Sequence, residues 1–201
     1  MIRDANRSIA FFDRQFERQI GEAQYGLNPF ERATLPHLRG EVLDLGCGLG
    51  NLSIAAAAAG ARVTAIDACD NAVADLQRRA RELRLPIEAR SADLRQWRPE
   101  RTWDAVACIG LLMFFPREAA RGGLAALRDA VRPGGIAAVN VLVEGTTYLD
   151  MFDPSGYYLF EPGELARAFP GWRLVHESAE TFPAPGATAK RFETLIVARP
   201  V

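Results

Sequence analysis

The spacing of apolar and polar positions changes several times along the chain, and each change predicts an element. Short apolar runs typical of buried strands cover residues 41–45, 62–66, 103–109 and 136–143, with a weaker run at 87–91. Helical spacing covers about 51–59, 70–83 and 117–131, between those runs. Strands that alternate with helices predict a parallel, doubly wound α/β sheet with helices on both faces.

The last third of the chain breaks this alternation. A short helix is expected near 163–169, followed by strands at 172–180 and 192–199. A Pro/Gly-rich loop, residues 182–189, joins these two strands in place of a helix. We therefore predict an antiparallel hairpin at one end of the sheet, which dinucleotide-dependent dehydrogenases do not ordinarily have.

Residues 1–40 precede the first strand and form the first of two predicted units, a helical arm. Ile9, Phe12, Phe16 and Ile20 recur at helical spacing. Two interpretations stay open: a helix packed on the sheet, or a lid over the ligand crevice that open α/β sheets form beyond the carboxyl ends of their strands. Residues 41–201 form the second unit, the ligand-binding domain.

Composition narrows the classes of function. The net charge of -1 and the pI of about 6.2 give no electrostatic basis for binding nucleic acid. No apolar run is long enough for a membrane span, and the N-terminus lacks a signal-peptide core, so a cytoplasmic protein is expected. The three cysteines and two histidines have no metal-ligand spacing, so no metal is expected. Arginine supplies almost all positive charge, which indicates a GC-rich genome, and Lys190 is the only lysine.

The strongest motif is VLDLGCGLGNLS, residues 42–53, where a buried strand enters a glycine-rich turn and a helix follows. Glycines let the backbone turn sharply and let a ligand approach the main chain. The dinucleotide fingerprint G-x-G-x-x-G would need glycine at Asn51. Asp44 stands just inside the strand end, where it suits a cationic amino-acid group better than a pyrophosphate. This contrast favours a sulfonium nucleoside over NAD.

Two further acids follow the next strands. Asp67 ends the second strand, where an acid can accept hydrogen bonds from both ribose hydroxyls. Asp93, in the SADL segment after the third strand, can accept a hydrogen bond from an adenine amino group, with Leu94 packed near the ring. Together the three acids indicate a site for an adenosine-type ligand.

The ordered motifs DLGCGLG, AIDAC, SADL, WDAVACI and RPGG resemble the class I S-adenosylmethionine-dependent methyltransferases over about residues 40–199. The resemblance implies a Rossmann-like, mostly parallel seven-stranded sheet with S-adenosyl-L-methionine as cofactor. It implies that the glycine loop holds the methionine end, that Asp67 holds the ribose, and that the end of the fourth strand offers backbone groups to the ammonium. The implied cofactor residues are Asp44, Gly46, Cys47, Gly48, Gly50, Asp67, Ala68, Cys69, Asp93, Leu94, Cys108 and Ile109.

A narrower resemblance links residues 110–135, 157–180 and 191–200 to the bacterial tellurite-resistance methyltransferases. That resemblance implies a small, soft acceptor of the chalcogen type. The family's His-Arg pair in the loop before the last strand is absent here, because the loop reads TFPAPGATAKRFE. Lys190 and Arg191 are the positive charges nearby.

Methyl transfer from a sulfonium mainly requires proximity, orientation and a dry pocket. No general base stands out in the sequence, which favours a small acceptor that is soft or already ionised, such as a thiol or a tellurite- or selenite-like oxyanion. The predicted acceptor-pocket residues are Phe12, Phe16, Tyr25, Met113, Phe114, Tyr157, Tyr158, Phe160 and Arg191. Whether the protein is a monomer or a homodimer stays open.

Three alternatives remain at this stage. An NAD(P)-dependent oxidoreductase would share the glycine turn and Asp67, but Asp44, Asn51 and the terminal hairpin disfavour it. A catalytically silent cofactor-binding module is disfavoured by the intact set of acids. A nucleic-acid methyltransferase is disfavoured by the charge balance and by the segment IGLLMFFP, which lacks an aromatic-proline tetrad.

Overall fold

The computed structural model describes residues 6–201, so residues 1–5 of the predicted arm lie outside the described residues. Seven strands form one sheet in the order β3-β2-β1-β4-β5-β7-β6. The strands are β1 (Glu41–Leu45), β2 (Arg62–Asp67), β3 (Ile87–Ser91), β4 (Trp103–Ile109), β5 (Val131–Leu142), β6 (Arg173–Ala184) and β7 (Thr188–Ala198). The first five strands run parallel and β7 is antiparallel to both of its neighbours. The predicted α/β fold with a C-terminal antiparallel hairpin is confirmed.

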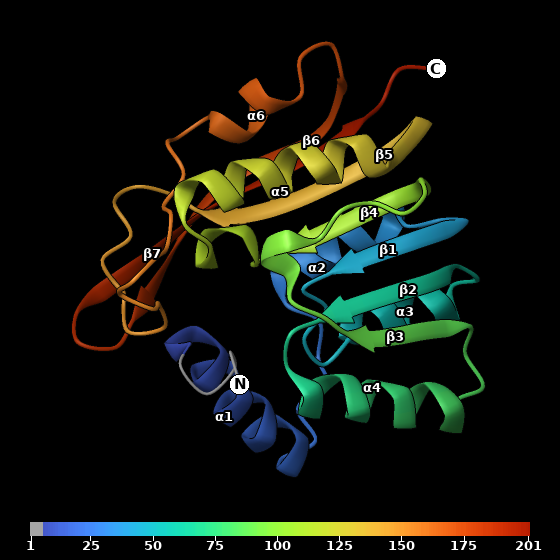
Figure 1. Ribbon diagram of the computed structural model, residues 1–201, viewed down its shortest axis with the longest axis horizontal. Helices are drawn as coiled ribbons and strands as arrows, with labels where there is room; N and C mark the ends of the chain where they lie inside the picture. The colour runs from blue at the N-terminus through green and yellow to red at the C-terminus, as the bar shows by residue number, and fades with distance from the viewer. Residues whose placement is uncertain (1–5) are drawn as a thin grey trace.

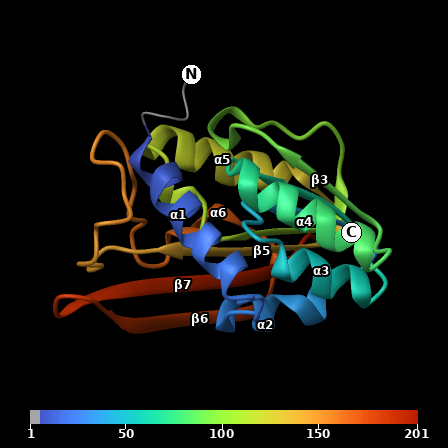
Figure 2. The same ribbon diagram turned by 90° about the horizontal axis from the view of Figure 1, so that it is seen from below.

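Helices cover both faces of the sheet (Figures 1 and 2). The α-helices are α1 (Arg7–Gly21), α2 (Pro29–Thr34), α3 (Asn51–Ala58), α4 (Asp70–Glu82), α5 (Arg117–Ala130) and α6 (Glu164–Ala168). Short 3-10 turns occur at η2 (Leu35–His37), η3 (Leu94–Gln96) and η4 (Leu112–Phe114). Among residues 6–201, no helix combines the length and apolar character that a bilayer crossing needs.

Two apolar clusters hold the helices to the sheet. One joins Leu127 of α5 to Val139 and Val141 of β5, all fully buried. The other joins Leu52 of α3 to Val42 of β1. Since successive side chains of a strand point to opposite faces, the near-continuous apolar runs seen in the sequence feed both clusters.

The C-terminal hairpin differs from its prediction in one respect. The expected loop at 182–189 is wrong, because β6 continues to Ala184 and β7 already starts at Thr188. Gly186 and Ala187 both have positive φ, 71° and 57°, and the Thr188 hydroxyl donates to the Pro185 carbonyl at 2.7 Å. A tight turn therefore replaces the loop, and the hairpin extends beyond the carboxyl ends of the parallel strands (Figure 1).

The N-terminal helix α1 lies across the carboxyl ends of β1, β2 and β3 (Figure 1), as the second view also shows (Figure 2). Asn6 caps it, accepting from Ile9 N at 3.1 Å. The Asp153 carboxylate accepts from Arg7 N, and Asp153 N donates to the Ser8 hydroxyl, each at 2.9 Å. These contacts fasten the start of α1 to the loop that follows β5.

Candidate active site

A cavity of about 470 Å³ opens at the carboxyl ends of the parallel strands, beneath α1. That volume lies within the range of roughly 300–1,000 Å³ usual for small-molecule sites. Its walls come from α1, α2, the glycine loop, the segments after β2, β3 and β4, and the ends of β5 and β7. The cavity therefore lies where open α/β sheets place their ligands.

The glycine loop forms the floor of this cavity. Gly46, Gly48 and Gly50 have φ values of 73°, 51° and 67°, which favour glycine. A Cβ at Gly48 would stand 2.9 Å from the Phe16 ring, and one at Gly50 would stand 2.4 Å from Leu76. All three positions thus need glycine for backbone conformation and for space.

Asp67 joins the glycine loop to the end of β2. Its two carboxylate oxygens accept from Gly48 N and from Cys69 N, each at 2.8 Å. Burial raises the pKa of Asp67, and these backbone hydrogen bonds oppose that rise. The carboxylate is thereby fixed in the cavity wall, where a ligand hydroxyl can donate to its remaining lone pairs.

Asp44 lies one layer deeper and does not line the cavity. It is 3% exposed and accepts from the Ser53 hydroxyl at 2.6 Å. Burial raises its pKa to about 7, and the Ser53 hydrogen bond opposes that rise. The charges of Glu31 and Asp67 raise it further, which places three carboxyl groups around the glycine loop.

The remaining predicted cofactor residues divide into two groups. Cys47, Ala68, Cys69, Asp93, Leu94 and Ile109 line the cavity. Asp93 pairs with Arg95 at 2.6 Å, so its carboxylate already has one partner. Cys108 does not line the cavity, because its side chain is buried in the cluster beneath α5.

Four of the predicted acceptor residues lie together on the cavity wall, namely Phe12, Phe16, Met113 and Phe114. The rings of Phe12 and Phe114 meet edge to face at 5.0 Å. This contact joins α1 to the segment after β4 and closes the apolar side of the cavity.

The other five lie outside the cavity lining. The Arg79 guanidinium covers the Tyr25 ring at 4.2 Å, and Tyr157 stacks on Phe152 at 4.6 Å. The Tyr158 hydroxyl donates to Glu164 at 2.7 Å, and Phe160 is fully buried in the core. Each aromatic ring therefore packs against the protein.

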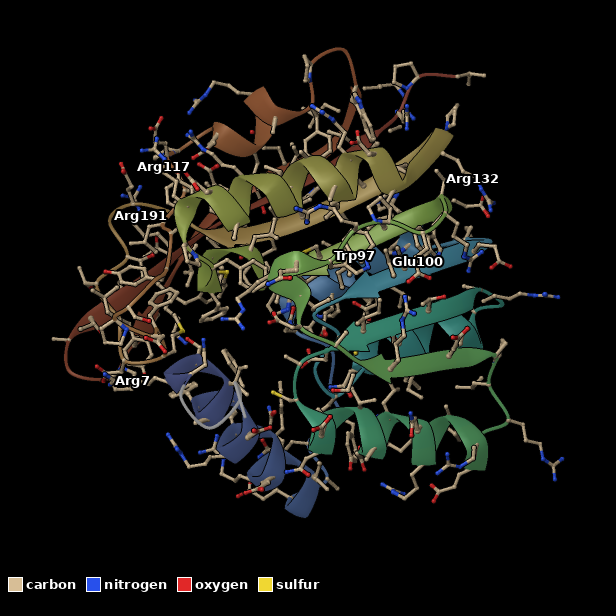
Figure 3. All side chains as sticks on the ribbon, viewed as in Figure 1. Arg7, Trp97, Glu100, Arg117, Arg132 and Arg191 are labelled. Carbon is tan, nitrogen blue, oxygen red and sulfur yellow. The ribbon has the colours of Figure 1, made fainter. Side chains whose placement is uncertain are left out.

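Arg191 points away from the cavity because it alternates with its neighbours along β7. Its guanidinium donates to the Glu144 carbonyl at 3.3 Å. Figure 3 shows Arg191 at the same end of the molecule as Arg7, whereas Arg132, near the start of β5, lies at the opposite end. The adjacent Lys190 lines the cavity instead.

The structure adds cavity residues that the pattern of the sequence did not single out, among them Glu31, Asn140 and Phe192. Glu31 belongs to a capping box, in which it accepts from Asn28 N at 2.7 Å while Asn28 accepts from Glu31 N. Burial raises its pKa. The sequence signal for Glu31 was the motif NPFE, which predicts a helix start and says nothing of a cavity.

Among residues 6–201, no group of three or more His, Cys, Asp or Glu side chains is arranged so that it could hold a metal ion. Burial raises the pKa values of Cys47, Cys69 and Cys108, so these thiols stay protonated. The cavity therefore offers fixed carboxylates, apolar walls and one lysine.

Comparison with known proteins identifies the family. The family described as a methyltransferase domain matches residues 42–135. Two ubiquinone biosynthesis O-methyltransferases are each 33% identical to this chain. The match to that of Paraburkholderia xenovorans covers 70% of this chain and 68% of the relative, and the match to that of Paramagnetospirillum magneticum covers 64% of this chain and 48% of the relative.

Among solved structures, TehB from Haemophilus influenzae has the same fold, with a TM-score of 0.72 and 20% identity over 85% of this chain and 61% of that chain. A complex of DhpI with SAH gives a TM-score of 0.62 and 23% identity over 96% of this chain and 95% of that chain. The chain therefore belongs to the S-adenosylmethionine-dependent methyltransferases, and it is an enzyme that uses S-adenosyl-L-methionine as its cofactor.

Proposed function

We propose that this enzyme methylates a small acceptor that carries negative charge, with thiolates and tellurite- or selenite-like oxyanions among the candidates. Lys190 is the observation that carries the proposal. It lines the cavity, and among residues 6–201 no carboxylate lies within ion-pair distance of its amino group. The amino group lies 4.8 Å from the centre of the Tyr148 ring, and burial lowers its pKa.

The opposite end of the cavity fits the cofactor. The glycine loop leaves its backbone open to a ligand, and Asp67 is fixed in the wall with lone pairs available for ribose hydroxyls. Ala68, Cys69, Asp93 and Leu94 complete a wall suited to an adenine ring. When bound, S-adenosylmethionine supplies a methyl group activated by a sulfonium.

The carboxyl groups of Asp44 and Glu31 fit the cationic amino-acid end of that cofactor. The negative charge of Glu31 disfavours ionisation of Asp44 and contributes to its raised pKa. A nearby ammonium would relieve this repulsion, with Glu31 in the wall and Asp44 behind the glycine loop.

The chain's own residues would then act mainly by placing the two reactants and excluding water. We propose that α1 serves as a lid over residues 41–201, because Phe12 and Phe16 form part of the cavity wall and the start of the helix is hydrogen-bonded to Asp153 in the loop after β5. An acceptor that is already ionised needs no base for the transfer, and Lys190 would hold its charge.

A second candidate is an acceptor hydroxyl, the atom type that the name of the curated O-methyltransferase relatives implies. Glu31 favours it, since a carboxyl group in the wall with a raised pKa can accept the proton that a hydroxyl loses.

Release of S-adenosylhomocysteine, measured over thiols, tellurite, selenite, carboxylic acids and neutral phenols, tests the proposal. We expect release with one of the anionic classes and a fall in its rate when the pH drops below the acceptor's pKa. Turnover confined to acceptors that are neutral at the reaction pH, with Glu31→Gln inactive although it still binds S-adenosylhomocysteine, would replace this proposal with the hydroxyl candidate.

A further inference from the structure

Asn140 is a polar residue inside the sheet at the cavity wall. It is 1% exposed and lies next to Ile109 in the register of β4 and β5, so it stands at the carboxyl end of the central strands. Its amide nitrogen donates to the Thr194 hydroxyl at 3.0 Å and to the Glu193 carbonyl at 3.3 Å. Its oxygen, Oδ1, is buried and has no hydrogen-bond donor among the described residues.

The orientation of this amide is fixed by its neighbours. The Glu193 carbonyl can only accept, so the Asn140 nitrogen must face it and Oδ1 must face elsewhere. A buried acceptor without a donor is unfavourable, and most such groups in proteins have a partner. Because Asn140 belongs to the cavity wall, a molecule in the cavity can supply the missing donor.

The same face of the sheet carries the cavity's lysine. Thr194, Phe192 and Lys190 are two residues apart along β7, so their side chains share one face. In the register of β5 and β7, Leu142 pairs with Phe192 and Asn140 pairs with Thr194. The cavity lining includes Asn140, Leu142, Phe192 and Lys190. At about 3.3 Å per residue, the Cα atoms of Thr194 and Lys190 lie about 13 Å apart.

This face therefore presents an acceptor atom at one end, apolar side chains in the middle and a cation at the other end. Building on the proposed function, we propose that the methyl acceptor is an organic anion with an apolar body, whose O–H or N–H group donates to Asn140 and whose anionic group lies at Lys190. A bare inorganic oxyanion lacks the apolar body that would span Leu142 and Phe192.

Binding of three matched compounds to the S-adenosylhomocysteine-loaded enzyme tests this inference. The probes are 3-(4-hydroxyphenyl)propionate, its 4-methoxy analogue and 3-phenylpropionate, with affinity measured by calorimetry. We expect the hydroxyl compound to bind about tenfold more tightly than the other two. In Asn140→Leu the three affinities should become similar, while affinity for S-adenosylhomocysteine stays unchanged.

Two further variants keep the outcomes distinct. If Asn140→Leu fails to bind S-adenosylhomocysteine, the test is repeated with Thr194→Val, which removes the hydroxyl that accepts from the Asn140 amide. A reduced preference for the hydroxyl compound in that variant supports the inference, and an unchanged preference overturns it. Equal binding of the three compounds by the unmodified enzyme, or no binding of any, also overturns it. Lys190→Met should weaken all three equally, and no effect there would refute the proposed anionic function while leaving the hydroxyl preference standing.

Discussion

The ring of Phe16 lies directly over Gly48, so close that a Cβ on the glycine would stand 2.9 Å from Phe16 Cζ. The helix α1 and the glycine loop are thus in contact at the floor of the cavity. Gly48→Ala combines this clash with a left-handed backbone, which costs roughly 1–3 kcal/mol. We expect affinity for S-adenosylhomocysteine, measured by calorimetry, to fall about tenfold or more.

Gly122→Ala is the matched control for that substitution. Gly122 lies in α5, and a Cβ there would meet nothing within 4 Å. Since alanine favours a helix over glycine by about 1 kcal/mol, this variant should be slightly more stable with unchanged affinity. Equal affinity of the two variants would argue against a role of the α1 contact in binding.

Asp67→Asn should weaken cofactor binding. The new asparagine keeps one oxygen that can accept, but its NH₂ group would face the backbone N–H of either Gly48 or Cys69. One of the two hydrogen bonds that fix the loop is therefore lost. The expected result is a much smaller thermal shift on adding S-adenosylhomocysteine, and Glu82→Gln on the exposed side of α4 should behave like the unmodified enzyme. A normal shift in Asp67→Asn would contradict the assignment of this carboxylate to the ligand.

Asp44 should make the stability of the ligand-free enzyme depend on pH. Its pKa in the fold, about 7, exceeds the ordinary value of 3.8, chiefly because of burial. The free energy of unfolding that depends on Asp44 is therefore highest below about pH 4. It declines as the pH rises and levels off above about pH 7. The difference corresponds to at most about 4 kcal/mol. Urea unfolding at several pH values measures it.

Asp44→Asn should remove that decline and be more stable than the unmodified enzyme at pH 8. The exposed Glu88→Gln is the control and should keep the decline, because Asp44 still titrates. Parallel pH profiles for the Asn variant and the unmodified enzyme would show that Asp44 is not the group responsible.

Lys190 and Arg191 form a natural pair of test sites. Lys190→Met removes the cation in the cavity wall, whereas Arg191→Met removes one that contacts the Glu144 carbonyl outside it. We expect Lys190→Met to raise KM for an anionic acceptor about tenfold or more and to leave cofactor affinity unchanged, with little effect of Arg191→Met. The reverse ranking would mean that the acceptor binds on the other face of β7.

The sequence predicted the sheet, its hairpin and most of the glycine-loop side of the cavity, because those features depend on local patterns. The positive φ values needed at Gly46, Gly48 and Gly50 are encoded by the glycines themselves. Asp67 follows its strand directly, so its position at the carboxyl end required only a correct strand assignment.

The acceptor side depends on long-range pairing, which the sequence pattern does not contain. Lys190 and Arg191 are adjacent, and only the register between β5 and β7 decides which one faces the cavity. Tyr157 and Tyr158 are predicted to line the cavity, but Tyr157 stacks on Phe152, the Tyr158 hydroxyl donates to Glu164, and neither residue lines the cavity. Asn140 stood in an apolar run and gave a strand signal only.

The position of β7 has a consequence for biosynthesis. This strand follows all the others along the chain, yet it lies between β5 and β6 and carries Lys190 together with the partners of Asn140. A nascent chain can assemble the β1–β4 half while the ribosome is still translating residues beyond it. The wall that would select the acceptor exists only after the final strand has emerged and inserted, so cofactor recognition can mature earlier than substrate recognition.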